Sequence, residues 1–229
     1  EALDAYAMAT RARARRGAVD TIIPAGGLGD DELRRWAPRD PAALPPAFAA
    51  LGAEGQDALL LARVPALARL GHVQHLHTAA SSPALADAAA LVVVMSARAA
   101  AAHGLRPRAR LVASATCAGD PLLMLTAGQE AVEKVLARAG LRAADVAVFE
   151  LAEAFAALCL RFARDLDVGE DRLNVRGGTI ALGHAFGATG AILLGNLVAL
   201  LEERGGRFGV AAVSGAAGLG VATLVERLG

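Results

Sequence analysis

The chain has 229 residues, long enough to bury a sizeable core as one large domain or two small ones. Hydrophobic residues make up 55% of it and aromatic residues only 3%, so we expect a core of alanine, valine and leucine. The 23 basic and 23 acidic side chains balance, which gives no electrostatic reason to expect nucleic acid or an anionic membrane as a partner. Cys117 and Cys159 are the only cysteines, too few for a secreted disulfide framework. These features predict a cytoplasmic α/β protein with no bound metal or cofactor.

The N-terminal stretch, residues 1–17, is predicted to be an amphipathic helix. Leu3, Tyr6 and Ala7 lie on one side of it, and the methyl group of Thr10 extends that face. The arginines at its end do not fit a signal peptide, and no apolar run in the chain reaches membrane-spanning length. The next segment, 19–26, is expected to be a strand or an extended linker.

Residues 27–70 contain several prolines between short helix-like pieces, which predicts an excursion of short helices and loops, such as a flap or an insertion. His72, His75 and His77 follow at close spacing. Alternating histidines on one face of a strand can bind a metal ion. No acidic residue or cysteine accompanies these three, so we expect no metal site.

Strands and helices alternate after residue 83. The apolar run from Leu91 to Met95 is predicted to be a buried strand, and a helix is predicted to follow it. This helix is predicted at 97–103. The further elements predicted from apolar periodicity are a strand at 108–118, a helix ending at Gly140, a buried strand at 146–151, a helix at 153–166, a helix at 191–201, and a strand pair at 207–214 and 220–227. This alternation indicates an α/β layered domain.

A loop with five glycines, from Asn174 to Gly190, separates two of these helices. Glycine allows positive φ or a close approach of other groups, so a tight irregular loop that leads into a helix is expected. Backbone N–H groups at such a helix start can bind an anion or a developing oxyanion. His184 lies in the middle of the loop. It is expected either to carry a proton or donate a hydrogen bond at a reacting centre, or to bond to a nearby carbonyl in a structural role.

This loop reads NVRGGTIALGHAFGATG, and a hydrophobic helix and a glycine-rich strand pair follow it. The combination resembles the C-terminal signature of the thiolases, coenzyme-A-dependent enzymes that cleave 3-ketoacyl-CoA or condense two acyl-CoA units. Other pieces occur in family order along the chain: DAYAMAT, PPAFAALG, ADAAALV, GDPLLMLT and FELAEAFA. In these motifs the chain is most similar to acetyl-CoA acetyltransferases of the fatty-acid-degradation type.

The resemblance implies the thiolase fold, an α/β arrangement of layered mixed sheets covered by helices, with a loop domain inserted in the first of two similar halves. Residues 1–105 are then expected to be the end of the first half, with the loop domain at about 18–82. Residues 106–229 are expected to be the complete second half. Thiolases assemble as dimers or tetramers, so a homo- or hetero-oligomer is implied. With most of the first half missing, we expect unpaired strand edges that need a partner or a longer polypeptide.

The resemblance implies catalytic roles for His184 and Ser214. His184 matches the histidine of the family's GHP motif, which helps to form an oxyanion hole; one such donor typically contributes roughly 10²–10³-fold in rate. Ala185 replaces the usual proline of that motif. Ser214 stands where the family has a cysteine as general acid/base, and a hydroxyl does not titrate near neutral pH as a thiol can. The alternative is that Ser214 only ends a strand and makes a backbone hydrogen bond.

Further positions depart from the family. Ala152 replaces the asparagine that positions a water in an oxyanion hole, and neither cysteine matches the family's nucleophile, so both are expected to be buried and inert. Pro83, directly after Ser81 and Ser82, replaces the serine that contacts coenzyme A in a turn of the family. The residues that the resemblance assigns to coenzyme A are Ser82, Met124, Phe155, Gly183 and Gly215.

Two hypotheses follow. In the first, the chain is a thiolase-type acyltransferase that takes a coenzyme A thioester as substrate, impaired by Ser214 and Ala152, with its nucleophile elsewhere. In the second, it is a non-catalytic thiolase-fold subunit that binds acyl-CoA or a catalytic partner chain.

Overall fold

The structure is a computed structural model that describes residues 1–17, 21–35 and 40–229. Within these residues one sheet is formed by β1 (Ala109–Ala118), β4 (Leu219–Arg227), β3 (Phe208–Gly215) and β2 (Val148–Leu151), in that order across the sheet. β4 runs antiparallel to both β1 and β3, and β2 runs parallel to β3. The predicted strand pair is confirmed as the β3–β4 hairpin, so the second half of the chain is the mixed α/β layer that was predicted.

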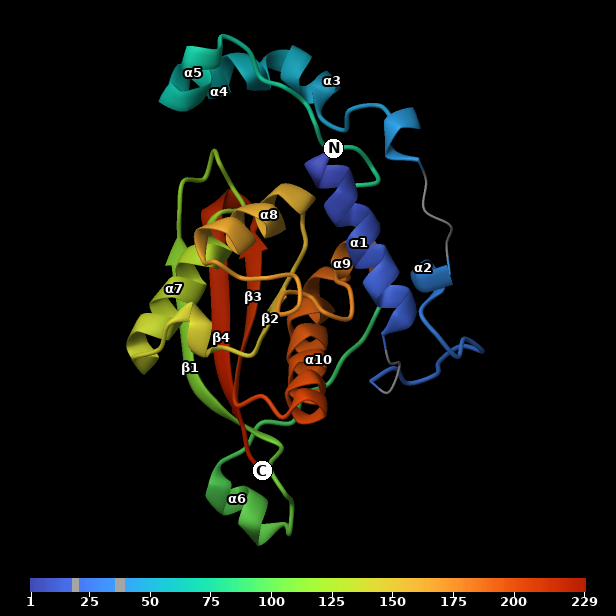
Figure 1. Cartoon of the computed structure of the whole chain (residues 1–229), viewed down its shortest axis with the longest axis vertical. Helices are drawn as coiled ribbons and strands as arrows, with labels where there is room; N and C mark the ends of the chain where they lie inside the picture. Colours follow the sequence, from blue (N-terminus) through green and yellow to red (C-terminus); the bar gives the residue numbers. More distant parts are fainter. Residues whose placement is uncertain (18–20, 36–39) are drawn as a thin grey trace.

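The longer helices are α1 (Ala2–Arg16), α7 (Ala127–Ala139), α8 (Ala156–Asp165) and α10 (Thr189–Arg204). Figure 1 shows α10 against one part of the sheet and α1 beside α9 and α8. Shorter helical pieces are α2 (Glu32–Arg35), η1 (Pro41–Ala43), α3 (Ala49–Leu51), η2 (Gly52–Gln56), α4 (Asp57–Arg63), α5 (Pro65–Leu70), α6 (Ala97–Ala102), η3 (Ala143–Asp145), α9 (Thr179–Leu182), η4 (Phe186–Ala188) and η5 (Ala216–Gly218).

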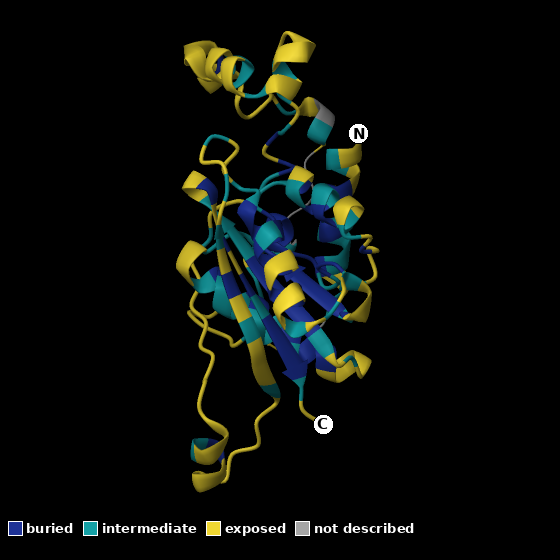
Figure 2. Cartoon of the chain, turned by 90° about the vertical axis from the view of Figure 1, so that its left-hand side faces the viewer, coloured by how far each residue is buried: buried dark blue, intermediate teal, exposed yellow. Residues whose placement is uncertain are grey.

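The sheet has an apolar cluster on each face, because successive residues of a strand point to opposite sides. In β2, Phe149 and Leu151 belong to the cluster that contains residues of α1, α7 and α8. Val148 belongs to the other cluster, where it joins Leu197 and Leu201 of α10. Figure 2 shows this buried interior in dark blue between exposed ends of the molecule. The core therefore lies in the second half of the chain, with α1 as the part of the N-terminal region that joins it.

Local signals placed several elements correctly. α1 buries Tyr6, Ala7 and Thr10, as its predicted apolar face requires. α7 ends before Gly140, which takes the left-handed conformation with φ 67° that ends many helices. The excursion of short helices after residue 27 is confirmed by α2 to α5. Of the predicted strand or linker at 19–26, residues 19 and 20 lie outside the described part, and residues 21–26 form no strand.

The predicted boundaries of two helices were wrong. α8 begins at Ala156, so Glu153 lies in the loop before it and not at the helix start. α10 begins at Thr189, before the predicted 191, and continues to Arg204. The prediction that no apolar run reaches spanning length was also wrong. By length and composition, Phe186–Arg204 could cross a membrane, although buried core helices pass the same test. α10 packs against β2 and β3, as a core helix does.

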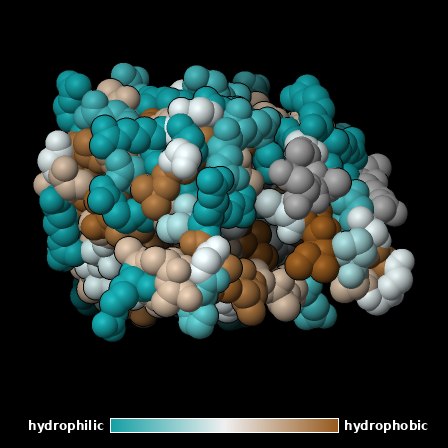
Figure 3. Space-filling view, turned by 90° about the horizontal axis from the view of Figure 1, so that it is seen from below, coloured by the Kyte–Doolittle hydropathy of each residue, from teal (hydrophilic) through white to brown (hydrophobic). Residues whose placement is uncertain are grey.

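The predicted buried strand at 91–95 does not form. This segment is extended but pairs with no other strand of the described chain, and the side chains of Leu91, Val93 and Val94 are 84%, 68% and 65% exposed. The reason is that a strand needs neighbours for its backbone groups and its two faces, and none lies beside it here. α6 follows it at the far end of the molecule (Figure 1). Viewed from that end, apolar side chains lie on the surface among polar ones (Figure 3).

Side chains occupy part of the edge of β1. The carbonyl of Ser114 accepts a hydrogen bond from Arg138 at 2.5 Å, and the carbonyl of Thr116 accepts one from Lys134 at 3.2 Å. Both donors come from α7, one turn apart. Long basic side chains at a sheet edge oppose the addition of another strand.

Candidate functional site

His184 is held at the end of α9 by its backbone and its ring. Gly183, with φ 89°, ends α9 and turns the chain, and the N–H of His184 donates to the carbonyl of Ala84 at 2.8 Å. The carbonyl of His184 accepts from the N–H of Ala86 at 3.3 Å. Its ring Nδ1 lies 3.0 Å from the hydroxyl of Thr189 at the start of α10. The glycine loop thus holds the imidazole between the segment 84–86 and α10.

The imidazole of His184 is half-buried, and desolvation lowers its pKa below the ordinary value of 6.5. The neutral ring is therefore favoured. When Thr189 donates to Nδ1, the proton of the neutral ring is on Nε2, which is then a hydrogen-bond donor. No group of the described residues is hydrogen-bonded to Nε2. This arrangement can stabilise a negative oxygen next to the ring.

Ser214 lies near the end of β3 and faces the start of α7. Its hydroxyl accepts a hydrogen bond from the N–H of Gly128 at 3.1 Å. Thr126, the residue before the helix, makes no capping bond with its side chain, so Ser214 satisfies one of the free N–H groups of the first turn. There is no room for a side chain at Gly128, because a Cβ atom there would lie 2.3 Å from the Ser214 hydroxyl. This contact gives the serine a structural partner.

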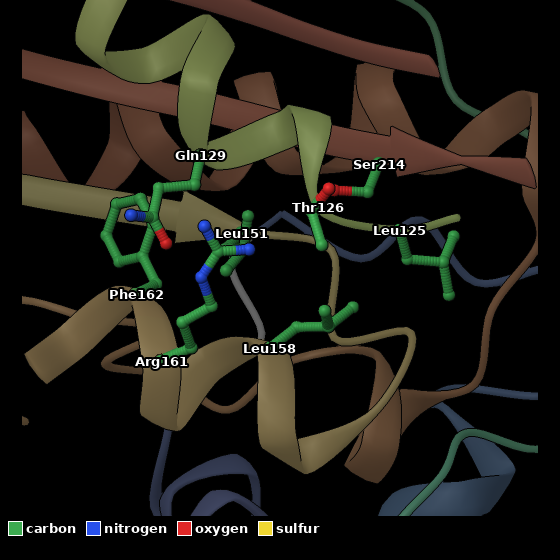
Figure 4. Close-up of a pocket in the computed structure, with 8 residues that line it drawn as sticks. All are labelled: Leu125, Thr126, Gln129, Leu151, Leu158, Arg161, Phe162 and Ser214. Atoms are coloured by element: carbon green, nitrogen blue, oxygen red, sulfur yellow. The ribbon is translucent and has the colours of Figure 1, made fainter. Parts of the chain in front are cut away.

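Ser214 also lines a small hollow between α7 and α8, shown in Figure 4. Its walls are partly apolar and partly polar: Leu125, Thr126, Gln129, Leu151, Leu158, Arg161, Phe162 and Ser214. The guanidinium of Arg161 is paired with Asp165 at 3.2 Å, and Gln129 donates to the same carboxylate. His184 is not among the lining residues, and no hydrogen bond within the described chain joins it to Ser214. The two predicted catalytic residues therefore do not form a pair in this structure.

Three of the residues assigned to coenzyme A gather around the segment that holds His184. The Ser82 hydroxyl donates to the carbonyl of Thr78 at 2.9 Å. Phe155 stacks edge-on against Phe48, with ring centroids 5.4 Å apart, and also contacts His77. The N–H of the residue after Phe155 donates to the carbonyl of Ser81, which links α8 to the turn that contains Ser82. Gly183 lies so close to this segment that a Cβ there would be 2.6 Å from the Cβ of Ala86.

The other two lie around the turn before α7. Met124 has φ 57° and is 43% exposed, and Gly215 is the last residue of β3, next to Ser214. The turn after β1 is bonded to the turn after β3, since the N–H of Gly119 donates to the carbonyl of Gly218 at 2.7 Å. Leu158, in the first turn of α8, lines the hollow beside Ser214. The start of α8 therefore lies between the two groups of residues.

The sequence did not predict a buried polar cluster around Glu153. Glu153 is fully buried, and one of its carboxylate oxygens accepts from Tyr6 at 2.7 Å, Thr10 at 2.9 Å and Asn174 at 3.0 Å. The other oxygen accepts from the N–H of Ile180 at 2.9 Å. Its donors come from α1, from the start of the glycine loop and from α9. The only signal in the sequence was Glu153 itself, an acid in an apolar stretch, and this signal does not predict which residues bind it.

Glu150 in β2 is a second buried acid. Burial raises its pKa to about 8, and the neighbouring Glu153 adds to the rise, while Arg176, Arg13 and Arg204 oppose it. Its Oε1 has no hydrogen-bond partner among the described residues. Glu150 is therefore largely protonated at neutral pH.

The remaining predicted positions behave as follows. Ala152 is buried and packs in the apolar cluster with Leu193 and Leu197, so its side chain contributes packing and no hydrogen bond. Cys159 is buried, and desolvation raises its pKa well above the ordinary value. Cys117 is only half-buried, which corrects the prediction for that residue, because it lies on the edge strand β1.

The three clustered histidines are not on a strand and have separate partners. His72 contacts the carbonyl of Leu70, His75 pairs with Asp57 at 3.0 Å, and His77 contacts the hydroxyl of Ser81. Within residues 1–17, 21–35 and 40–229, no three histidine, cysteine or acidic side chains are grouped so that they could hold a metal ion.

Comparison with known proteins gives consistent results. Residues 105–227 match the family model described as thiolase, C-terminal domain. A 3-ketoacyl-CoA thiolase from Alcanivorax borkumensis is 43% identical over 154 residues, which are 66% of this chain and 39% of that protein. One from Aeromonas hydrophila is 44% identical over 154 residues, 66% of this chain and 40% of that protein. The chain thus spans about two fifths of the length of these relatives.

Solved structures agree over almost the whole chain. The Bacillus anthracis acetyl-CoA acetyltransferase superimposes with a TM-score of 0.81 at 28% identity, covering 99% of this chain and 56% of that one. A thiolase from Ascaris suum in complex with coenzyme A gives 0.77 at 27% identity, again with 99% and 56% coverage. The predicted thiolase fold is therefore confirmed, and this chain belongs to the thiolase family.

Proposed function

We propose that the chain is part of a thiolase-type acyltransferase that acts on acetyl-CoA or 3-ketoacyl-CoA, by thiolytic cleavage or Claisen condensation. The observation that carries the proposal is the geometry of His184. Burial favours the neutral ring, and with Thr189 as the donor to Nδ1 the ring proton is on Nε2, which can then donate to a thioester oxygen. In this role His184 is the oxyanion-hole donor.

Coenzyme A is the proposed carrier of the acyl group. Ser82, Phe155 and Gly183 lie around the segment that holds His184, as a common binding region requires. The Ascaris suum thiolase was solved with coenzyme A, which supports the same ligand here. Met124 and Gly215 complete the proposed contacts from the side of α7.

The nucleophile is proposed to lie in the part of a thiolase that these 229 residues do not cover. Cys159 is buried with a raised pKa, so its thiol is a poor nucleophile, and Cys117 lies on a strand far in sequence from the glycine loop. The chain spans about two fifths of its curated relatives, 39% of one and 40% of another. The proposal assigns the acyl-accepting cysteine to the remaining part, in this polypeptide or in a partner chain.

The activity is proposed to be impaired. Ser214 bonds to Gly128, and Ala152 has a buried methyl group in place of a hydrogen-bonding side chain. Loss of a positioned acid/base typically costs roughly 10²–10⁴-fold in rate. A Ser214→Cys variant is expected to raise the rate, because a thiol can titrate near neutral pH.

The test is mass spectrometry of the intact protein from its source, before and after incubation with acetyl-CoA or acetoacetyl-CoA. We expect a covalent gain of one acetyl group on the polypeptide that carries the nucleophile. An intact protein that gains no acetyl group and shows neither thiolysis nor condensation would contradict the proposal. A His184→Ala variant serves as control and should acetylate more slowly.

The second candidate is a non-catalytic thiolase-fold subunit. It is favoured by the structural partner of Ser214 and by the exposed apolar segment 91–95, which is suited to burial against another chain. A Ser214→Ala variant separates the two candidate functions. Loss of a measurable turnover in this variant rules out the non-catalytic role. The non-catalytic role is supported if the substitution changes no turnover and the protein forms no acetyl adduct.

Assembly, domain division and location are parts of the same proposal. We propose that residues 1–105 end a first domain, including a loop domain at about 18–82, and that 106–229 form a second. The exposed apolar segment at 91–95 supports a homo- or hetero-oligomer or a longer chain. The two free thiols, Cys117 and Cys159, are consistent with the cytoplasm, where thiols stay reduced.

A further inference from the structure

We propose that Glu153 is the positioning residue for His184: its buried carboxylate fixes α9, and through α9 the imidazole, while α1 supplies half of the hydrogen bonds that hold the carboxylate. The proposal rests on the proposed function, because His184 is the group positioned. It adds to that function a residue and an element far from His184 in sequence.

The four partners of Glu153 are all hydrogen-bond donors. They are the hydroxyls of Tyr6 and Thr10, the amide NH2 of Asn174 and the backbone N–H of Ile180. An ionised carboxylate only accepts hydrogen bonds, so it satisfies all four at once. A glutamine would turn an NH2 group toward at least one of these donors. The site therefore requires a carboxylate and not merely a polar side chain of the same size.

The glycine loop is shaped around this carboxylate. A Cβ atom on Gly178 would lie 2.3 Å from the Cδ of Glu153, so only glycine fits beside the acid. The N–H of Gly178 donates to Thr10 at 3.0 Å, and a Cβ on Gly177 would lie 2.6 Å from the Cβ of Ala14. Two successive glycines thus allow α1 and the carboxylate to touch the loop from two sides.

The position of α9 determines that of His184. Ile180, whose N–H binds Glu153, lies in this one-turn helix, and the N–H of Gly183 donates to Thr179 at 2.8 Å at its end. His184 follows directly. Its backbone N–H is bonded to Ala84, and its ring to Thr189, so a shift of α9 strains both bonds. Glu153 therefore acts on the imidazole without touching it.

The test compares Glu153→Gln with Glu203→Gln in the protein as its source makes it. Glu203 carries the same charge on the surface, where it pairs with Arg176 and its side chain is 57% exposed. The readout is the NMR titration of the His184 ring, assigned with a His184→Gln variant. Because burial lowers the pKa of His184, loosening α9 should raise it toward 6.5 in Glu153→Gln. Glu203→Gln should leave it unchanged.

A second variant keeps the proposal testable if Glu153→Gln does not fold. Tyr6→Phe removes one donor and leaves the carboxylate in place, so a smaller upward shift of the His184 titration is expected. The proposal is overturned if Glu153→Gln folds and His184 titrates in it as in the unaltered protein. If Glu153→Gln does not fold, the same result in a folded Tyr6→Phe variant overturns it. The titration needs no substrate. If acetyl-CoA leaves no adduct while the shift is seen, the proposed function fails and the positioning role stands.

Discussion

The segment 91–95 and strand β2 are both short and mostly apolar, but one is exposed and the other is buried. β2 is buried at all four positions, whereas Leu91, Val93 and Val94 are mostly exposed. β2 pairs with β3, and Phe149 also forms a bridge to Leu173 on its other side. The exposed segment has neither neighbour. The difference teaches that an apolar run becomes a buried strand only where adjacent strands satisfy its backbone and other layers cover its faces.

The largest effect on stability should come from removing an aromatic ring from β2. Phe149 is 1% exposed and packs edge-on against Phe162, with centroids 5.4 Å apart. We expect Phe149→Ala to lower the free energy of unfolding by about 3–5 kcal/mol. Val93→Ala, on the unpaired segment, should change it by less than about 0.5 kcal/mol. Urea unfolding of both variants measures the two values.

A large loss in Val93→Ala would break the comparison. It would mean that the segment 91–95 is covered in solution, by a second copy or by another part of the protein. Repeating the unfolding at several protein concentrations separates these two cases, because only a second copy makes the midpoint depend on concentration.

A second large effect, which depends on pH, is expected at Glu150, the one acid within β2. Its folded-state pKa of about 8 is above the ordinary 4.5, so between these values the folded state retains a proton that the unfolded state has lost. Stability is therefore highest below about pH 4.5 as far as this group is concerned, and falls as the pH rises to about 8. Glu150→Gln should remove this loss, with a gain over the unaltered protein that grows by up to about 1.4 kcal/mol per pH unit.

Urea unfolding across that pH window measures the gain. Glu54→Gln, at an exposed position of η2, serves as control and should show no such slope. A constant difference between Glu150→Gln and the unaltered protein at every pH would mean that Glu150 titrates normally in the folded state.

The smallest effect is expected at Ser214, which joins the end of β3 to α7. Ser214→Ala removes the acceptor of the Gly128 N–H and should cost about 1 kcal/mol, the usual effect of losing a helix cap. Ser114→Ala, at an exposed position of β1, should cost less than about 0.5 kcal/mol. Thermal unfolding compares the pair. Equal losses would show that the contact with Gly128 contributes nothing.

The features that were predictable from the sequence depend on near neighbours. The end of α7 at Gly140 follows from a glycine after an apolar periodic run, and the β3–β4 hairpin follows from two strands around a glycine turn. The glycine loop was recognised because its pattern is long and local. The prediction of a catalytic role for His184 rests on the same local pattern.

What failed depends on residues distant in sequence. Glu153 was placed at a helix start, since nothing local reveals that Tyr6 and Asn174 bind it. The strand at 91–95 was predicted from composition, which does not say whether neighbouring strands are present. The lack of contact between His184 and Ser214 depends on how α8 lies between two loops, which no local pattern encodes.

The contacts of α1 also have a consequence for biosynthesis. Tyr6 and Thr10 emerge from the ribosome 147 and 143 residues before Glu153. At about 5–20 residues per second, that interval is roughly 7 to 30 s. During it, the apolar side of the first helix has no carboxylate or glycine loop to bind. This face of α1 therefore stays without its polar partners until Glu153 has been synthesised, and faster elongation shortens that interval.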